Sequence, residues 1–138
     1  MVFPNRSSNR GGHRRGSAAA ELVAVAPLLL FILIVAIDFC RLFFAYTIIT
    51  NAARNGALYA SDPRYQSLYA NFQAAALADA NNLNPALTEA NVTLSTWTDA
   101  QRNNWVSVKV QYQFNMISSY LGFSNVNLWR QVTMRMTP

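Results

Sequence analysis

The chain has 138 residues and a formal net charge of +5, from 11 Lys and Arg against 6 Asp and Glu. Hydrophobic residues make up 52% of it and charged residues only 12%, about half of the roughly 25% usual in soluble domains. This composition excludes a disordered chain, which needs low hydrophobicity and high charge. A single Cys excludes an intramolecular disulfide, and one His with one Cys cannot form the usual zinc sites. The length allows one small domain and one membrane segment.

The basic charge is concentrated in the first sixteen residues, which contain no acid and four arginines: Arg6, Arg10, Arg14 and Arg15. The rest of the chain is nearly neutral, with seven basic and six acidic residues. A nucleic-acid surface would need a basic patch on the folded part, so we expect no nucleic-acid partner. Ser, Asn and Gly dominate this stretch, which predicts a disordered arm. Its arginines are also typical of a signal that keeps the N-terminus in the cytoplasm.

An uncharged apolar run extends from Leu22 to Ile37. As a helix its sixteen residues would span about 24 Å, and small or apolar neighbours lengthen it towards the ~30 Å of a bilayer core. We predict one transmembrane helix, because the remaining chain is too small to surround a buried core helix. Pro27 lacks an amide proton and crowds the preceding turn, which predicts a kink there.

The charges on either side of this run predict its orientation. The N-terminal flank holds the four arginines, whereas the other flank has Arg41 and Arg54 with Asp38 beside the first. Positive charge is retained in the cytoplasm, so we expect a single-pass membrane protein. Its N-terminus would be cytoplasmic and its C-terminal domain extracytoplasmic, with membrane lipid as one partner.

The segment before the apolar run carries a candidate processing signal. Gly16 precedes the small residue Ser17, and Glu21 follows five positions after the Gly. This arrangement resembles the type IV prepilin signal, and the resemblance implies a cut between Gly16 and Ser17 by a membrane prepilin peptidase. Glycine lets an extended backbone enter a narrow active site. An acid at a membrane is a functional candidate; by the resemblance Glu21 pairs with the new ammonium of Ser17 in an adjacent subunit, and the alternative is that it marks the membrane boundary.

Three separated stretches between about residues 14 and 60 resemble the TadE-like family of tight-adherence pilus assembly. Residues 21–30, ELVAVAPLLL, are similar to the family's E-F-A-L-V-x-P-L-L-L run, which includes Pro27. Residues 38–41, DFCR, resemble its E-F-G-R step, with Asp38 for Glu and Cys40 for Gly. Residues 50–57, TNAARNGA, resemble its T-N-A-A-R-x-G-A stretch, which places Asn51, Arg54 and Gly56.

The residues of these stretches also have a physical interpretation. Asp38 and Arg41 share a helical face and could neutralise each other, pair between subunits, or form a surface pair of little energetic value. Small residues such as Ala52 and Ala53 suit close helix packing. We predict a helix from about Ala18 to Ala60, about 65 Å long, in which Gly56 is a candidate bend. Cys40 is interpreted as a small packing residue.

The remaining residues 61–138 predict a small extracytoplasmic α+β domain. Asp62 before Pro63 stops the long helix, and apolar residues at three- and four-residue steps predict a second helix from Tyr65 to Leu83. Alternation of apolar and polar residues predicts strands at 92–96, 106–114 and 128–136, whereas 117–123 is either a short helix or a loop. We expect a three-stranded antiparallel sheet packed on the second helix.

No catalytic arrangement is recognisable. The single His, His13, lies in the predicted leader, and Cys40 has no partner base. The acids beyond the apolar run are dispersed, and a phosphate-binding glycine loop is missing. The three tryptophans suit a core or interface role better than a sugar-binding surface. We therefore expect no enzyme, no cofactor and no metal site.

The expected organisation is a basic leader at 1–16 that is removed, a membrane helix with its extension at 17–60, and an outer domain at 61–138. By resemblance the protein lies in the bacterial inner membrane and functions as a minor pilin or pseudopilin in tight-adherence pilus assembly, which implies cell adhesion. The implied partners are the prepilin peptidase, other pilins through the N-terminal helix, and the inner-membrane assembly platform. The alternatives are a membrane-anchored binding module and a major filament subunit.

Overall fold

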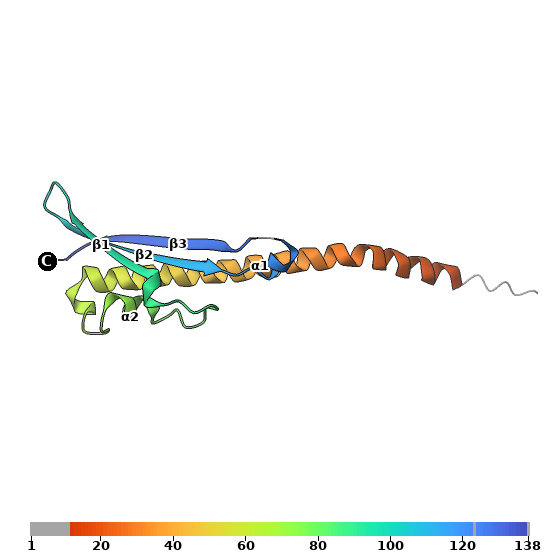
Figure 1. Ribbon diagram of the computed structural model, residues 1–138, viewed down its shortest axis with the longest axis horizontal. Helices are drawn as coiled ribbons and strands as arrows, with labels where there is room; N and C mark the ends of the chain where they lie inside the picture. Colours follow the sequence, from red (N-terminus) through yellow and green to blue (C-terminus); the bar gives the residue numbers. More distant parts are fainter. Residues whose placement is uncertain (1–11, 123, 138) are drawn as a thin grey trace, which may run out of the picture. The chain divides into compact units, whose positions relative to one another are not determined.

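The computed structural model describes residues 12–122 and 124–137. They form one long helix, several short helical segments and a three-stranded antiparallel sheet, so the predicted α+β class is confirmed (Figure 1). The chain divides into two units, residues 1–36 and residues 37–138.

The long helix α1 (Gly12–Ser61) runs through both Pro27 and Gly56. It contains the whole predicted helix 18–60 and begins several residues earlier. Its stop is the predicted one, because Asp62 before the proline has an extended backbone. Among the described residues it is the one helix long and apolar enough, between Ala19 and Ser61, to cross a membrane.

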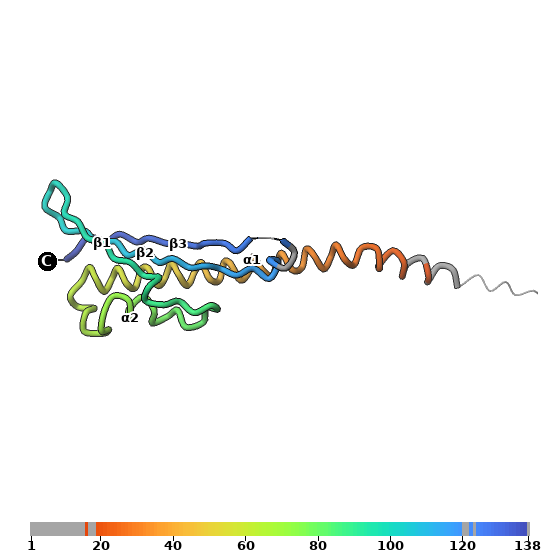
Figure 2. The backbone as a smooth tube through the Cα atoms, viewed as in Figure 1, coloured from red at the N-terminus to blue at the C-terminus, as the bar shows by residue number. Residues whose placement is uncertain are grey.

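The sheet consists of β1 (Val92–Thr98), β2 (Asn104–Phe114) and β3 (Val126–Arg135), in that order. Val108 at the centre of β2 faces Leu94 on one side and Val132 on the other, which fixes the register. The predicted hairpin between the first two strands is present, and its turn stands clear of the helix (Figure 2). The free edges are those of β1 and β3.

The sheet packs on α1, and this corrects the expectation that it packs on a second helix. One core contains the inner face of β2 and a stripe of small residues on α1. From α1 the core takes Ala45, Ile49, Ala52, Ala53 and Ala57, and from β2 it takes Val108, Val110, Tyr112 and Phe114. The small side chains of α1 let the valines of β2 approach the helix closely.

The predicted second helix is largely wrong. Residues 65–83 contain only the end of η1 (Pro63–Tyr65) and the six-residue helix α2 (Phe72–Leu77). The reason is local, because the Asn71 side chain accepts a hydrogen bond from the amide of Ala74 at 2.6 Å and starts a new helix there. The turns around 66–70 and 81–82 are rich in Asn, Ser and Tyr, which are weaker helix formers than Ala or Leu.

Two further 3-10 segments complete the fold, η2 (Glu89–Asn91) before β1 and η3 (Ile117–Leu121) between β2 and β3. The open choice for residues 117–123 is thus settled as a short helical turn over its first five residues. In residues 37–138 the sheet lies along one side of α1 and α2 along another (Figure 1).

Candidate functional site

Asp38 is the most completely enclosed charged residue of the described chain, with 1% of its surface exposed. Its two carboxylate oxygens accept hydrogen bonds from two backbone amides of η3, that of Ile117 at 2.9 Å and that of Ser118 at 2.7 Å. Arg41, one turn along α1, donates to the same carboxylate at 3.1 Å. The site therefore joins α1 to a turn about eighty residues away in the sequence.

The sequence of η3 explains why the turn needs this carboxylate. The first amides of a helical segment have no acceptor within the segment and require a cap. Met116 occupies the cap position of η3 and makes no side-chain bond to it. Asp38 supplies the acceptor from α1, and its negative charge lies at the positive end of the turn. The carboxylate thus acts as an N-terminal cap contributed by another element.

Arg41 completes the charge balance of the site. Its guanidinium carbon lies 5.2 Å from the centre of the Phe114 ring at the end of β2, a cation–π arrangement. Arg41 is half-buried, so its attraction to Asp38 is screened less than in a fully exposed pair. Asp38 and Arg41 thus pair within one chain, and the pair differs from a surface pair because two backbone hydrogen bonds accompany it, of which that from Ser118 is buried.

Two further contacts attach the sheet to α1. Arg130 of β3 donates to the Thr50 hydroxyl at 3.3 Å, and its guanidinium carbon lies 4.7 Å from the centre of the Tyr46 ring. At the other end of the sheet the amide of Thr137 donates to the carbonyl of Ser61 at 2.8 Å. The sheet is therefore attached along α1 from Asp38 to Ser61.

The other predicted residues of α1 in the second unit have different surroundings. Asn51 and Arg54 are exposed, whereas Gly56 is buried where α1, α2 and β2 meet. A Cβ on Gly56 would lie 3.2 Å from a methyl of Val108 and 3.3 Å from the carbonyl oxygen of Phe72. Gly56 is thus a point of close approach, and the helix continues through it. Cys40 is exposed and makes no packing contact with the core of this chain.

The candidate processing and topology residues belong to the first unit, and two of them lie outside the described residues. Gly16, Glu21 and Pro27 are exposed residues of α1. Ser17, Arg14 and Arg15 lie in α1 by their backbone, and Arg6 and Arg10 lie outside the described residues. The apolar run itself has large exposed side chains, among them Leu22, Val23, Leu28, Leu30 and Ile32.

Sequence reasoning missed the role of another ordered carboxylate, Asp99, in the turn between β1 and β2. It accepts hydrogen bonds from the Asn103 amide at 2.8 Å and from the Trp105 indole nitrogen at 3.0 Å. These bonds, that of the indole first, lower the pKa of Asp99 to about 2. An acid at the start of a hairpin turn with an Asn four positions later was the available signal. No group of metal-ligating side chains was found among the described residues.

Comparison with known proteins supports the motif resemblance. Residues 16–58 match the family model described as TadE-like protein, a match that covers less than half of the chain. No curated protein and no solved structure matches the sequence or the fold. The matched segment contains Gly16, Glu21, Asp38 and Gly56 and ends just before the end of α1. Most of α1 is therefore similar to the TadE-like family.

Proposed function

We propose that the chain is a minor pilin or pseudopilin of TadE-like type, inserted with its N-terminus in the cytoplasm and cut between Gly16 and Ser17 by a prepilin peptidase. The single observation that carries this proposal is the family match, which begins at residue 16 and covers the apolar helix. The basic residues before Gly16 and the acid at Glu21 are the other parts expected of such a signal.

The exposed apolar surface of α1 supports the same role. Leu22 is 65% exposed and Val23 is 72% exposed, and such side chains require lipid or other helices around them. We propose that lipid covers them first and that other pilin helices replace it in the assembled state, on an inner-membrane assembly platform. We propose that Glu21 then pairs with the free ammonium of Ser17 in a neighbouring subunit, because opposite charges compensate each other where little water is present.

Mass spectrometry of the mature N-terminus tests the processing step. The expected peptide begins at Ser17. Gly16→Leu should leave the leader attached, because a side chain would obstruct the peptidase, whereas the matched change Gly12→Leu should not. An intact leader on the wild-type protein would contradict the proposed processing.

A second experiment separates assembly from anchoring. Glu21→Ala should be cut normally and yet be reduced in the fraction sheared from cells, with Thr47→Ala, an exposed position of the same helix, as control. Normal recovery of Glu21→Ala would reject the charge pairing. Recovery of the wild-type chain as the bulk of sheared filaments would instead favour a major subunit.

The proposed orientation is tested by fusing alkaline phosphatase after Pro138. We expect the fused enzyme to be active, and an inactive fusion at normal expression would reverse the orientation.

The outer face of the sheet favours the alternative of a membrane-anchored binding module. Trp129 is 60% exposed and borders a hollow of about 340 Å³ with four amide side chains: Asn91, Gln111, Gln113 and Asn127. The residues of the hollow carry no charge, and an aromatic ring with neutral amides suits a neutral carbohydrate. Titration of Trp129→Ala and of the control Ser95→Ala with neutral oligosaccharides tests this, and equal responses would exclude the site.

A further inference from the structure

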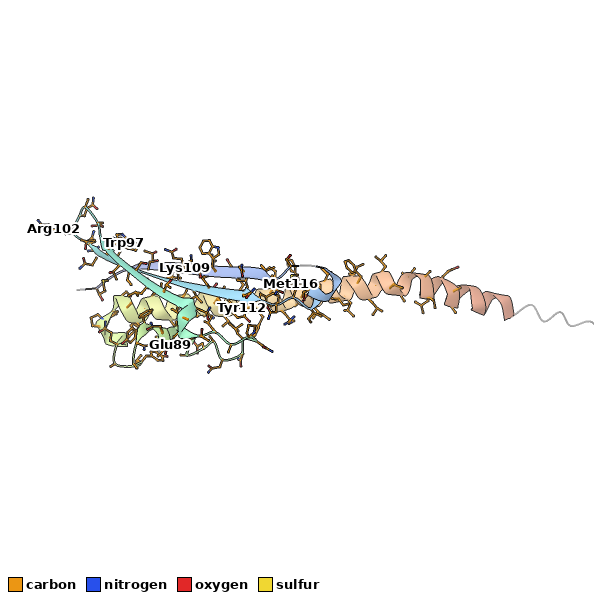
Figure 3. All side chains as sticks on the ribbon, in the orientation of Figure 1. Glu89, Trp97, Arg102, Lys109, Tyr112 and Met116 are labelled. Carbon is orange, nitrogen blue, oxygen red and sulfur yellow. The ribbon has the colours of Figure 1, made fainter. Side chains whose placement is uncertain are left out.

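The hydrogen bonds of Asp38 hold η3 beside one position along α1, that of Asp38 itself. Asp38 is the first charged residue after the apolar run, and it holds the amides of Ile117 and Ser118. The turn between β2 and β3 therefore lies beside the helix at the residue where the apolar run ends. Figure 3 labels Met116, the residue before η3, close to α1.

The surface around this level is apolar and has no cover within the second unit. Ile117 is 45% exposed, although the next residue, Ser118, is buried. On α1, Phe39 is 60% exposed and Phe43 is 58% exposed, and their ring centres are 5.3 Å apart. The sequence from Asn115 to Asn127 has no charged residue. Charged side chains, which would keep this surface in water, are thus missing from the turn.

Several backbone amides of the turn are hydrogen-bonded within the protein, which suits an environment with little water. The amides of Ile117 and Ser118 donate to Asp38, that of Ser119 donates to the carbonyl of Met116, and that of Gly122 donates to the carbonyl of Ser119. An unpaired amide costs several kcal/mol in hydrocarbon, so irregular backbone enters a membrane only where its polar groups are satisfied. The same bonds allow the charge of Asp38 to remain at the membrane boundary, because three donors compensate it.

We propose that η3 is a lipid-contacting foot of the outer domain, in which Ile117 enters the interfacial layer of the bilayer beside Phe39 and Phe43. The partner is the lipid surface, chosen because the apolar patch follows the apolar run along the helix, and the two charges beside it, Asp38 and Arg41, pair with each other. The foot would fix the height and rotation of the outer domain above the membrane. This inference rests on the proposed membrane anchoring.

Single-cysteine labelling of the full chain tests the foot. Cys40→Ser removes the only cysteine, and a cysteine is then introduced by Ile117→Cys and labelled with an environment-sensitive fluorophore. The protein is reconstituted in vesicles of phosphatidylethanolamine and phosphatidylglycerol, and quenching by nitroxide-labelled lipid is measured. Val35→Cys within the apolar run and Ser95→Cys on β1 provide the two reference positions.

We expect quenching at position 117 to lie between the two references and at least about twofold above that at 95. Quenching at 117 equal to that at 95, with strong quenching at 35, would overturn the foot and leave the membrane helix intact. Weak quenching at 35 as well would contradict the anchoring itself. Loss of quenching at 117 on raising the protein-to-lipid ratio would show that a second copy covers the patch, and this outcome would also reject lipid as its partner.

Discussion

At the scale of single residues, Asp38 shows how an acid at the end of an apolar helix can be useful. Its carboxylate has three donors from two elements, so its burial leaves no unpaired charge. Backbone amides of η3 supply two of the three, which means that the acid constrains a turn and does more than balance Arg41. The family's acid-to-arginine step is thereby given a structural role in this chain.

Replacing the carboxylate should loosen η3 from the helix. Asp38→Ala leaves the buried amide of Ser118 without an acceptor, and we expect the free energy of unfolding to fall on the order of 2–3 kcal/mol. Asp38→Asn keeps one acceptor oxygen and should cost less. Chemical denaturation in detergent, followed by tryptophan fluorescence, measures both.

Asp79→Ala is the matched control, because exposed Asp79 has a single side-chain bond, from Asn55 on α1. Its free energy of unfolding should change little. An Asp38→Ala loss no larger than that of Asp79→Ala would mean that η3 does not depend on the carboxylate.

Asp99 should make the β1–β2 turn sensitive to acid. Its pKa falls from 3.8 to about 2 in the folded chain, so the ionised form is favoured by folding. The resulting stabilisation is present above the unfolded pKa of 3.8 and is lost as the pH falls towards about 2. The indole N–H resonance of Trp105 should shift in this window, because its acceptor is protonated.

The control for this titration is Asp99→Asn, which cannot ionise. Its Trp105 resonance should show no transition between pH 4 and about 2. A transition of the same size in Asp99→Asn, or none in the wild-type chain, would assign the acid response to another group.

At the scale of elements, α1 has two different faces in residues 37–61. Ala45, Ile49, Ala52 and Ala53 are buried under the sheet or the loops, because positions three and four apart share one face. The opposite side has Phe39 and other exposed residues: Cys40, Phe43, Phe44, Thr47, Asn51 and Arg54. This exposed side changes from aromatic to polar with distance from the apolar run, as expected for a helix that leaves a membrane.

Gly56 sets the distance between α1, α2 and β2, and a larger residue should force them apart. Gly56→Leu is expected to lower the free energy of unfolding by about 1–3 kcal/mol, because overpacking displaces Val108 and the backbone of Phe72. Gly56→Ala should cost less, since better helix propensity offsets part of the crowding. Denaturant unfolding measures both variants.

Asn51→Leu provides the comparison for Gly56→Leu, because position 51 is exposed on the same helix. It should unfold within about 0.5 kcal/mol of wild type. If Gly56→Leu were equally mild, the close approach at Gly56 would not limit the packing.

At the scale of the whole molecule, residues 37–138 fold as one unit because α1 supplies part of their core. The sheet alone has one apolar face and about eighty residues of sequence around it, close to the lower limit for an independent core. Val108 and Val110 of β2 are fully buried, and the small residues of α1 lie in the same cluster.

A fragment of residues 37–138 should therefore fold, whereas one of residues 62–138 should not. The second lacks the buried stripe of α1 and exposes the inner face of the sheet to water. Amide NMR dispersion in mild detergent distinguishes the two. A dispersed spectrum from residues 62–138 would show that the sheet and α2 suffice for the core.

The sequence by itself determined the features that depend on local pattern. Sixteen uncharged apolar residues and their flanks predicted α1, Asp62 before Pro63 predicted its end, and period-two alternation predicted all three strands. The three TadE-like stretches predicted the family-model match over residues 16–58, because such motifs are local in the sequence. Helical spacing also placed Asp38 and Arg41 on one face, but it left open whether they pair within the chain, between subunits or only weakly at the surface.

Only the tertiary structure decided which elements pack together. The periodicity of residues 65–83 predicted a long helix under the sheet. Instead Asn71 caps the six-residue helix α2, and the alanine-rich face of α1 packs against the sheet. The amides that hold Asp38 are about eighty residues away, and Gly56 is tight because β2 and α2 both reach it. Such contacts join residues that are far apart in the sequence, and local propensity or spacing does not indicate which distant residues will meet.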